Sequence, residues 1–444
     1  MSDQAPQEEA DTPGLMEALS GLIKTGPAYW LVNLVNFTDG IAYFGILNIL
    51  VLYFSHDLHI PDQYASVYVS VLTGLVALLM VPGGWISDSL GIRNAMTLSL
   101  ALGFVGRAAL WQCDKLPASF LPMGVVLSLV VMAFATGILQ TALYAGVKET
   151  TTVRLSSMAF SLLYAIMNLG IVVESLASPY VRTQSGLNLG YGGVIGLMAL
   201  ITFLQLALHV FTFPRMDGVA QAAPDATEEP IGIESADNLG PANPLADPRF
   251  LFFIFILLPV RTLFAHQWLT LGPYITRCFG QAVSDKFEWF NALNPLVIFF
   301  AVPILCHLTA RVHVLRMMII GTAVSAGATF LLSLPPDVGR LVAYVLVFSL
   351  GEALWASRFL EYVARLAPPG KVGAYMGVGN LPWFLAKFTT GLYSGAMLTR
   401  YVPMEGTRSP EALWTIYGFI ACVSPVGLLL AYPWLRAGDK EKTQ

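Results

Sequence analysis

Apolar residues occupy long stretches along most of the chain, and short polar segments separate these stretches. A helix that crosses a lipid bilayer needs about 20 mostly apolar residues. The pattern therefore predicts an all-α membrane protein with twelve transmembrane helices. Their expected positions are 27–54, 64–87, 94–113, 119–147, 156–181, 188–213, 250–278, 288–309, 314–334, 338–366, 372–399 and 411–436.

One longer polar segment lies near the middle of the chain. Residues 214–249, PRMDGVAQAAPDATEEPIGIESADNLGPANPLADPR, are rich in Pro, Ala, Asp and Glu and have no apolar face. This segment divides the predicted helices into two groups of six, which is typical of secondary transporters built from two structural repeats. The expected organisation is an arm at 1–26, a six-helix bundle at 27–213, a linker at 214–249, a second bundle at 250–436 and a tail at 437–444.

The composition also favours a membrane protein. Hydrophobic residues make up 56% of the chain and charged residues 12%, about half the charged fraction of a soluble domain. The net charge of −4 and the absence of a basic tract give no indication of nucleic-acid binding. The four cysteines are far apart, and no Walker, Gly-x-Ser-x-Gly or HExxH motif occurs. We therefore expect no metal, no cofactor, no enzymatic activity and no ATP-driven transport.

The charges in the predicted loops indicate an orientation. Lys and Arg are more frequent on the side that carries both termini. Because positively charged loops prefer the cytoplasm, both termini are expected inside, in a plasma membrane or, in a bacterium, the inner membrane. The first 20 residues lack the basic and apolar regions of a signal peptide and are expected to form a cytoplasmic arm.

The turn after the second predicted helix carries a recognisable motif. The stretch GGWISDSLGIRNA contains Gly84-x-x-x-Asp88-x-x-Gly91-x-Arg93, which resembles the signature between helices two and three of the major facilitator superfamily. The resemblance implies two pseudo-symmetric six-helix bundles, alternating access and a monomer. It also implies a gate or interface role for Asp88 and Arg93.

Four further stretches resemble motifs of the proton-dependent oligopeptide transporter family, in that family's order. NFTDGIAYFG (36–45) is similar to ExxERxxYYG, and MAFSLLYAIMNLG (158–170) to FYxxINxG. WFNALNPLVIFFAVPIL (289–305) resembles the Asn-Pro motif of helix eight, and GEALWASRFLEYVARLAPPGKVGAYMG (351–377) resembles helix ten. The resemblance implies symport of protons with small peptides or amino-acid-like zwitterions.

The first of these motifs is incomplete. The three charged positions of ExxER fall on Asn36, Asp39 and Gly40, so one acid remains and the arginine is absent. The lysine expected in helix four corresponds to Gln140. These departures leave open a different solute, through export of a drug or metabolite or uptake of an organic acid.

Charged residues near the middle of predicted helices supply the candidate site. A charge at the bilayer centre costs about 2.5–3.5 kcal/mol and usually faces a partner or a cavity. Asp39 and Glu352 are the candidate proton-binding residues, and the alternative for Asp39 is a structural ion pair or a carboxylate that satisfies the backbone beside Gly40. The candidate substrate-binding residues are Tyr43, Arg261, His266, Gln267, Glu352, Trp355 and Lys387.

Arg261 has two interpretations. Its guanidinium can bind a substrate carboxylate through two hydrogen bonds, or it can pair with Glu352 or Asp39 in the empty protein. Arg358 and Glu361 are three residues apart near the cytoplasmic end of their predicted helix, which favours an inner gate or a structural pair.

Overall fold

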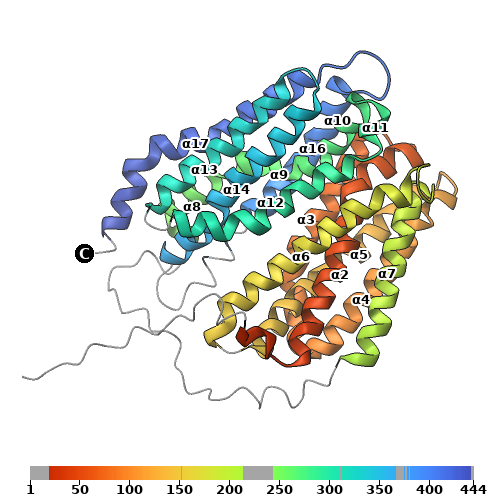
Figure 1. The fold of residues 1–444 in the computed structure, drawn as a ribbon, viewed down its shortest axis with the longest axis horizontal. Coiled ribbons are helices and arrows are strands. Elements are labelled where there is room, and N and C mark those ends of the chain that lie inside the picture. The colour runs from red at the N-terminus through yellow and green to blue at the C-terminus, as the bar shows by residue number, and fades with distance from the viewer. Residues whose placement is uncertain are drawn as a thin grey trace, which may run out of the picture.

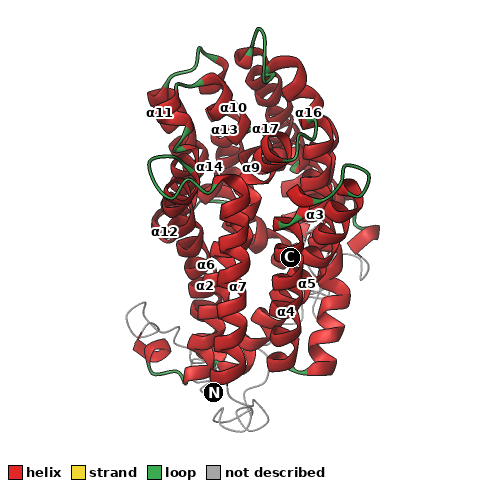
Figure 2. Cartoon of the chain, turned by 90° about the vertical axis from the view of Figure 1, so that its right-hand side faces the viewer, coloured by secondary structure: helices red, strands yellow, loops and turns green. Residues whose placement is uncertain are grey.

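All the secondary structure in the described part of the chain is helical (Figure 2). The computed structural model describes residues 20–151, 153–213, 244–309, 312–366, 375, 378–379 and 381–441. The predicted arm falls mostly outside these residues, as do most of the predicted linker and the last residues of the tail.

The first half of the chain forms six long helices. They are α2 (Pro27–Leu52, continued by a π-helical turn at Tyr53–Asp57), α3 (Asp62–Leu90), α4 (Ile92–Trp111), α5 (Leu121–Thr150), α6 (Val153–Arg182) and α7 (Gly190–Thr212), with a short 3₁₀ turn at Cys113–Lys115.

The second half contains more and shorter helices. They are α8 (Pro248–Ile256), α9 (Leu258–Leu269), α10 (Leu271–Cys278), α11 (Gln281–Ser284), α12 (Phe287–Leu308), α13 (Val314–Thr329), α14 (Val338–Leu366), α16 (Leu381–Tyr401) and α17 (Pro410–Glu441), with 3₁₀ turns at Pro244–Ala246 and Phe330–Ser333. The helices extend past the predicted bundle limits, because α8 begins at Pro248 and α17 continues to Glu441.

Nine helical segments of the described residues are long and apolar enough to cross a membrane. The three other predicted spans correspond to α4, α12 and α16. In α12 the apolar stretch is shorter and covers Phe287–Val302. The chain is a multi-pass helical membrane protein.

The predicted span at 250–278 is not one continuous helix, since breaks at Leu257 and Thr270 divide it into α8, α9 and α10, although Pro248–Leu269 together are long and apolar enough to cross a membrane. Pro259 and Pro273 lie just after the two breaks. A proline has no N–H to donate to the carbonyl four residues earlier and crowds the preceding turn. The N–H of Val260, beside the first break, donates to the Ser424 hydroxyl of α17 at 2.9 Å, so a neighbouring helix satisfies the freed backbone.

The helices form two bundles that lie side by side, α2–α7 and α8–α17 (Figure 1). Two helix pairs make most of the contact between them, α3 with α16 and α6 with α12. Helix α2 also touches α9 and α10. A Cβ atom on Gly395 of α16 would collide with the backbone of Asp62 in α3, so glycine allows the α3–α16 pair to approach closely.

Candidate functional site

Asp39 forms an ion pair inside the N-terminal bundle. Its Oδ1 atom lies 2.8 Å from Nη2 of Arg107 on α4, and Nη1 of Arg107 donates to the Thr202 hydroxyl of α7 at 2.8 Å. Asp39 is 6% exposed and Arg107 is 3% exposed. This geometry is that of a buried pair that ties α2 to α4 and α7, the structural alternative for Asp39. The sequence analysis did not identify Arg107 as the partner of Asp39.

The packing of α2 on α6 explains why no arginine stands at position 40. A Cβ atom on Gly40 would lie 2.7 Å from the Met167 carbonyl oxygen, and one on Gly170 would collide with the Phe37 carbonyl. A glycine of each helix therefore packs directly against the backbone of the other helix. A long side chain at Gly40 has no room, and the guanidinium that faces Asp39 comes from a different helix.

Glu352 has a neutral partner. The side-chain amide of Asn294 on α12 donates to Oε2 of Glu352 at 2.8 Å and also approaches the Ser349 hydroxyl at 2.9 Å. Glu352 is 8% exposed, and it lies near enough to Tyr164 of α6 to act on it electrostatically. Glu352 therefore lies near α6 of the other bundle. No ion pair joins it to a cation within the described residues.

Arg261 is enclosed by aromatic rings. Its guanidinium carbon lies 4.2 Å from the ring centre of Phe359, 4.9 Å from Trp383 and 5.9 Å from Trp355. The side chain is fully buried, and Nη1 reaches the Gly379 carbonyl at 3.5 Å. The Nε and Nη2 atoms have no hydrogen-bond partner among the described residues. Neither Glu352 nor Asp39 pairs with it, so the expected internal pairing is absent here.

Lys387 of α16 is a second cation, and like Arg261 it lies at the contact between helices α9 and α16. Its Nζ atom lies 6.0 Å from the ring centre of Trp268 on α9, and its backbone carbonyl accepts from Ser70 of α3 at 3.0 Å. The side chain is half-buried. Within the described residues no carboxylate pairs with it.

The other candidates on α9 are held by neutral groups. Both ring nitrogens of His266 have hydroxyl partners, Thr270 at 2.8 Å and Tyr393 at 3.1 Å, and the ring stacks on Tyr417 at 3.7 Å. The amide of Gln267 donates to the Tyr344 hydroxyl at 3.1 Å. His266 and Gln267 therefore order the aromatic side chains around α9.

Two aromatic candidates lie near the charged groups. Tyr43 is half-buried, sits one turn after Asp39 on α2 and packs edge-on against Phe44 at 5.2 Å. Trp355 is 1% exposed and lies over Arg261.

The candidate gate residues are only partly described, because the side chains of Asp88 and Glu361 lie outside the described residues. Gly91 between α3 and α4 has a φ of 75°, which glycine adopts without strain. Arg93 donates to the Val210 carbonyl of α7 at 3.1 Å. Arg358 donates to the Thr309 hydroxyl at 3.2 Å, and therefore holds α14 to the C-terminal end of α12.

Sequence reasoning missed two buried ion pairs that connect the halves. Arg277 of α10 binds both carboxylate oxygens of Asp62 on α3, at 2.6 and 2.7 Å. Arg182 of α6 binds both oxygens of Glu288 on α12, at 2.8 and 2.9 Å. Both pairs lie where α3 and α12 begin and α6 and α10 end, so both close the same end of the molecule.

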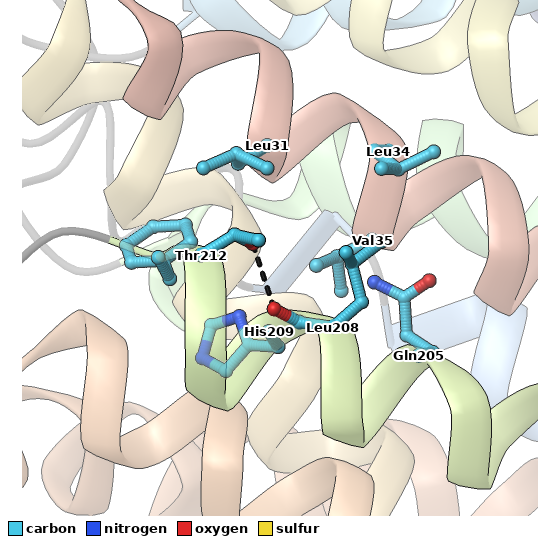
Figure 3. Close-up of a pocket in the computed structure, with 8 residues that line it drawn as sticks. Leu31, Leu34, Val35, Gln205, Leu208, His209 and Thr212 are labelled. Carbon is cyan, nitrogen blue, oxygen red and sulfur yellow. Dashed lines mark hydrogen bonds between the residues drawn. The ribbon is translucent and has the colours of Figure 1, made fainter.

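A shallow groove between α2 and α7 lies apart from these charges (Figure 3). It is lined by the apolar side chains of Leu31, Leu34, Val35, Leu208 and Phe213, with Gln205, His209 and Thr212 as polar members. Gln205 accepts from the Thr38 hydroxyl, and Thr212 donates to the Leu208 carbonyl at 2.7 Å. The groove carries no charged side chain. In the described part of the chain, no three His, Cys, Asp or Glu side chains gather as a metal site requires.

Comparison with known sequences identifies relatives over most of the chain. The sequence model of the Major Facilitator Superfamily matches residues 32–273. Dipeptide and tripeptide permease A of Chromobacterium violaceum is 23% identical, over 94% of this chain and 95% of the relative. The protein of the same name from Escherichia coli is 23% identical over 89% and 88%. An uncharacterized MFS-type transporter of Bacillus subtilis, YqjV, is 22% identical over 80% and 85%.

Comparison with solved structures shows a shared fold. A peptide transporter POT in complex with sulfate superposes with a TM-score of 0.73 at 17% identity, over 92% of this chain and 94% of that one. A POT family transporter in complex with 5-aminolevulinic acid gives a TM-score of 0.69 at 18% identity, over 92% and 96%.

Proposed function

The chain belongs to the major facilitator superfamily, and on that premise we propose that it is a secondary active transporter that carries small peptides or amino-acid-like zwitterions together with protons. The family and the fold are those of transporters. The relatives named as dipeptide and tripeptide permeases cover most of the chain, which supports the substrate class. The transporter acts as a monomer, as the resemblance implies.

Alternating access needs an end that can close and open. The Asp62–Arg277 and Arg182–Glu288 pairs hold the two halves together at one end. Both pairs lie at the helix ends away from the start of α2 and the end of α17. With both termini in the cytoplasm, as the loop charges suggest, these pairs form the outer gate, and they separate when substrate enters from outside.

Glu352 is the proposed proton carrier. A carboxyl group whose partner is the Asn294 amide can bind a proton without breaking an ion pair. Protonation of Asp39 would instead cost the bond to Arg107, so Asp39 is the less suitable of the two. Glu352 also lies near α6 of the other half, where a change in charge can alter how the halves fit together.

The substrate is proposed to lie against the α9, α14 and α16 side of the site. Arg261 and Lys387 offer positive charge to a carboxylate, and Glu352 offers negative charge to an amino group. Trp355 and Tyr43 supply apolar surface, while His266 and Gln267 fix the rings behind them. The observation that carries the proposal is the membrane-buried Glu352 with a neutral partner in a superfamily transporter.

The test uses purified protein in liposomes that contain a pH-sensitive dye. An inward-negative potential is imposed, a mixture of di- and tripeptides is added outside, and internal acidification is recorded. We expect acidification in the wild type and its loss in Glu352→Gln, with peptide counterflow retained. The matched control is Glu149→Gln, at an exposed position on α5, which should behave as the wild type.

Two results would contradict the proposal. Unchanged proton-driven uptake in Glu352→Gln would remove Glu352 as the proton carrier. Absence of any peptide response from folded wild-type protein would indicate a different solute, and a screen of drugs, metabolites and organic acids would then identify it.

A further inference from the structure

Arg261 and Lys387 are two cations on neighbouring helices, and neither pairs with a carboxylate in the described part of the chain. The acids that could have neutralised them have other partners. Asp39 binds Arg107, and Glu352 accepts a hydrogen bond from Asn294. The C-terminal half therefore presents more positive than negative charge at the candidate site.

The two cations lie on one seam between α9 and α16. Arg261 of α9 contacts the ring of Trp383 on α16, and Lys387 of α16 contacts the ring of Trp268 on α9. Trp383 and Lys387 are four residues apart, which is about 6 Å along a helix axis. Arg261 and Trp268 are seven residues apart, about 10 Å. The two positive groups are thus separated by one to two helical turns along the seam.

Two nitrogen atoms of the Arg261 guanidinium, Nε and Nη2, can together bind one carboxylate, and we call this pair of atoms the fork. In the part of the chain that the structure describes, Nε and Nη2 have no hydrogen-bond partner although the side chain is fully buried. Arg182 uses the same two atoms to bind both oxygens of Glu288, so the chain itself shows what this fork accepts. A buried charge without a counter-ion is unfavourable, and aromatic faces offset only part of that penalty. A carboxylate from the ligand would satisfy the fork.

We propose that the preferred substrates carry two carboxylates and a net negative charge, as in dipeptides with an Asp or Glu side chain. The proposal rests on the proposed function and deepens it. One carboxylate binds the fork of Arg261 as the aromatic side chains around it move aside, and the other binds Lys387. Two residues of an extended peptide span about 7 Å, which fits the separation of the two cations along the seam.

The experiment compares matched competitors in liposomes that take up a labelled neutral dipeptide. Unlabelled Ala-Glu, Ala-Gln and Ala-Lys are titrated, because Ala-Glu and Ala-Gln have nearly the same shape and differ in charge. We expect Ala-Glu to compete about tenfold more strongly than Ala-Gln, from one charge-assisted hydrogen bond, and Ala-Lys to compete most weakly. In Lys387→Gln the ratio of Ala-Glu to Ala-Gln competition, measured against the variant's own uptake of the neutral dipeptide, should fall to near unity, whereas Glu149→Gln should keep the wild-type ratio.

Lys387 is the tested position because it is half-buried, so its replacement threatens folding less than replacement of Arg261. Equal competition by Ala-Glu and Ala-Gln in the wild type would overturn the inference and leave peptide transport standing. A preference that Lys387→Gln retains would also overturn it.

A second measurement separates this inference from the proposed function. If folded wild-type protein takes up no peptide, thermal unfolding is recorded with L-glutamate and with L-glutamine. Stabilisation by glutamate that Lys387→Gln abolishes would support the two-cation site although peptide transport fails. Absence of such stabilisation would overturn the inference as well.

Discussion

The two halves of the molecule contain the same kind of buried arginine in opposite electrostatic settings. Arg107 of the N-terminal half is 3% exposed and is neutralised by Asp39, with Thr202 taking a second hydrogen bond. Arg261 of the C-terminal half is equally buried, but three aromatic rings and a distant carbonyl surround it. The buried arginine of the N-terminal half therefore has a counter-ion, whereas the buried arginine of the C-terminal half has none among the described residues.

The two candidate acids, Asp39 and Glu352, follow the same division. The N-terminal half also holds Glu174 on α6, which is 1% exposed and has Asn48 and Ser175 as hydrogen-bond partners. Asp39 is committed to its arginine, whereas Glu352 has an amide partner and no cation within the described residues. A charged side chain with an ion-pair partner on another helix holds the two helices together. A charged side chain without such a partner can bind a proton or a ligand. We infer from this comparison that the exchange of ions takes place in the C-terminal half and that the Asp39–Arg107 pair is a structural anchor, and the following variants test that inference.

The largest effect is expected from Arg107→Gln. This change leaves Asp39 buried without its counter-ion, and breaking a buried pair in this way costs about 3–5 kcal/mol. Thermal unfolding of the detergent-solubilised protein should show a corresponding loss of stability. The double variant Asp39→Asn/Arg107→Gln should recover most of it, because no lone charge remains. A double variant as unstable as the single one would show that the ion pair is not what stabilises this half.

A smaller loss is expected from Gly40→Ala. The added methyl group would lie 2.7 Å from the Met167 carbonyl oxygen and would force α2 away from α6, at a cost of about 1–3 kcal/mol. The control is Gly327→Ala on α13, where a Cβ atom meets nothing within 4 Å and stability should be kept or slightly raised. Equal behaviour of the two variants would mean that close packing of α2 on α6 does not exclude a side chain at position 40.

Hydrophobic patterning was enough to predict the helices, because each span must bury its own backbone hydrogen bonds. It did not predict the two helix breaks within 250–278. Proline is common inside membrane helices, and whether the helix breaks there depends on local geometry and on neighbours such as Ser424 of α17. The resemblance placed Asn294 in a motif, but its bond to Glu352 joins helices far apart in sequence.

The partners of the predicted site residues were harder to foresee. Arg107 is 68 residues from Asp39, and only its position inside an apolar stretch marked it as unusual. Arg182 and Glu288 lie at helix ends, where charged residues are common, so their sequence positions gave no sign of a buried pair. Pairing between distant helices requires the packed structure.

An intermediate effect on conformation is expected from Glu288→Gln. Arg182 would lose its charged partner but keep the Asp285 carbonyl and its ring contacts with Tyr191 and Phe287, so the cost is about 1–2 kcal/mol. Hydrogen exchange at residues 271–288 should become about tenfold faster as this end opens more often.

The control for this variant is Asp285→Asn, because within the described residues the Asp285 side chain hydrogen-bonds to Gln281 alone and the carbonyl used by Arg182 remains. Exchange in Asp285→Asn should match the wild type. If Glu288→Gln also matches the wild type, the pair does not hold this end closed, and the proposed outer gate rests on Asp62 and Arg277 alone.

The smallest effect on stability is expected from Arg261→Met, and it gives the sharpest view of the difference between the halves. Methionine replaces a buried cation without stranding an acid, so the free energy of unfolding should change by no more than about 1 kcal/mol or increase. Arg107→Met leaves Asp39 buried without its counter-ion, and its free energy of unfolding should fall by about 3–5 kcal/mol. Unfolding of the two variants is measured side by side, together with uptake of an acidic dipeptide, which Arg261→Met should abolish. If both variants are equally unstable, Arg261 is a structural group like Arg107, and the inferred difference between the two halves is wrong.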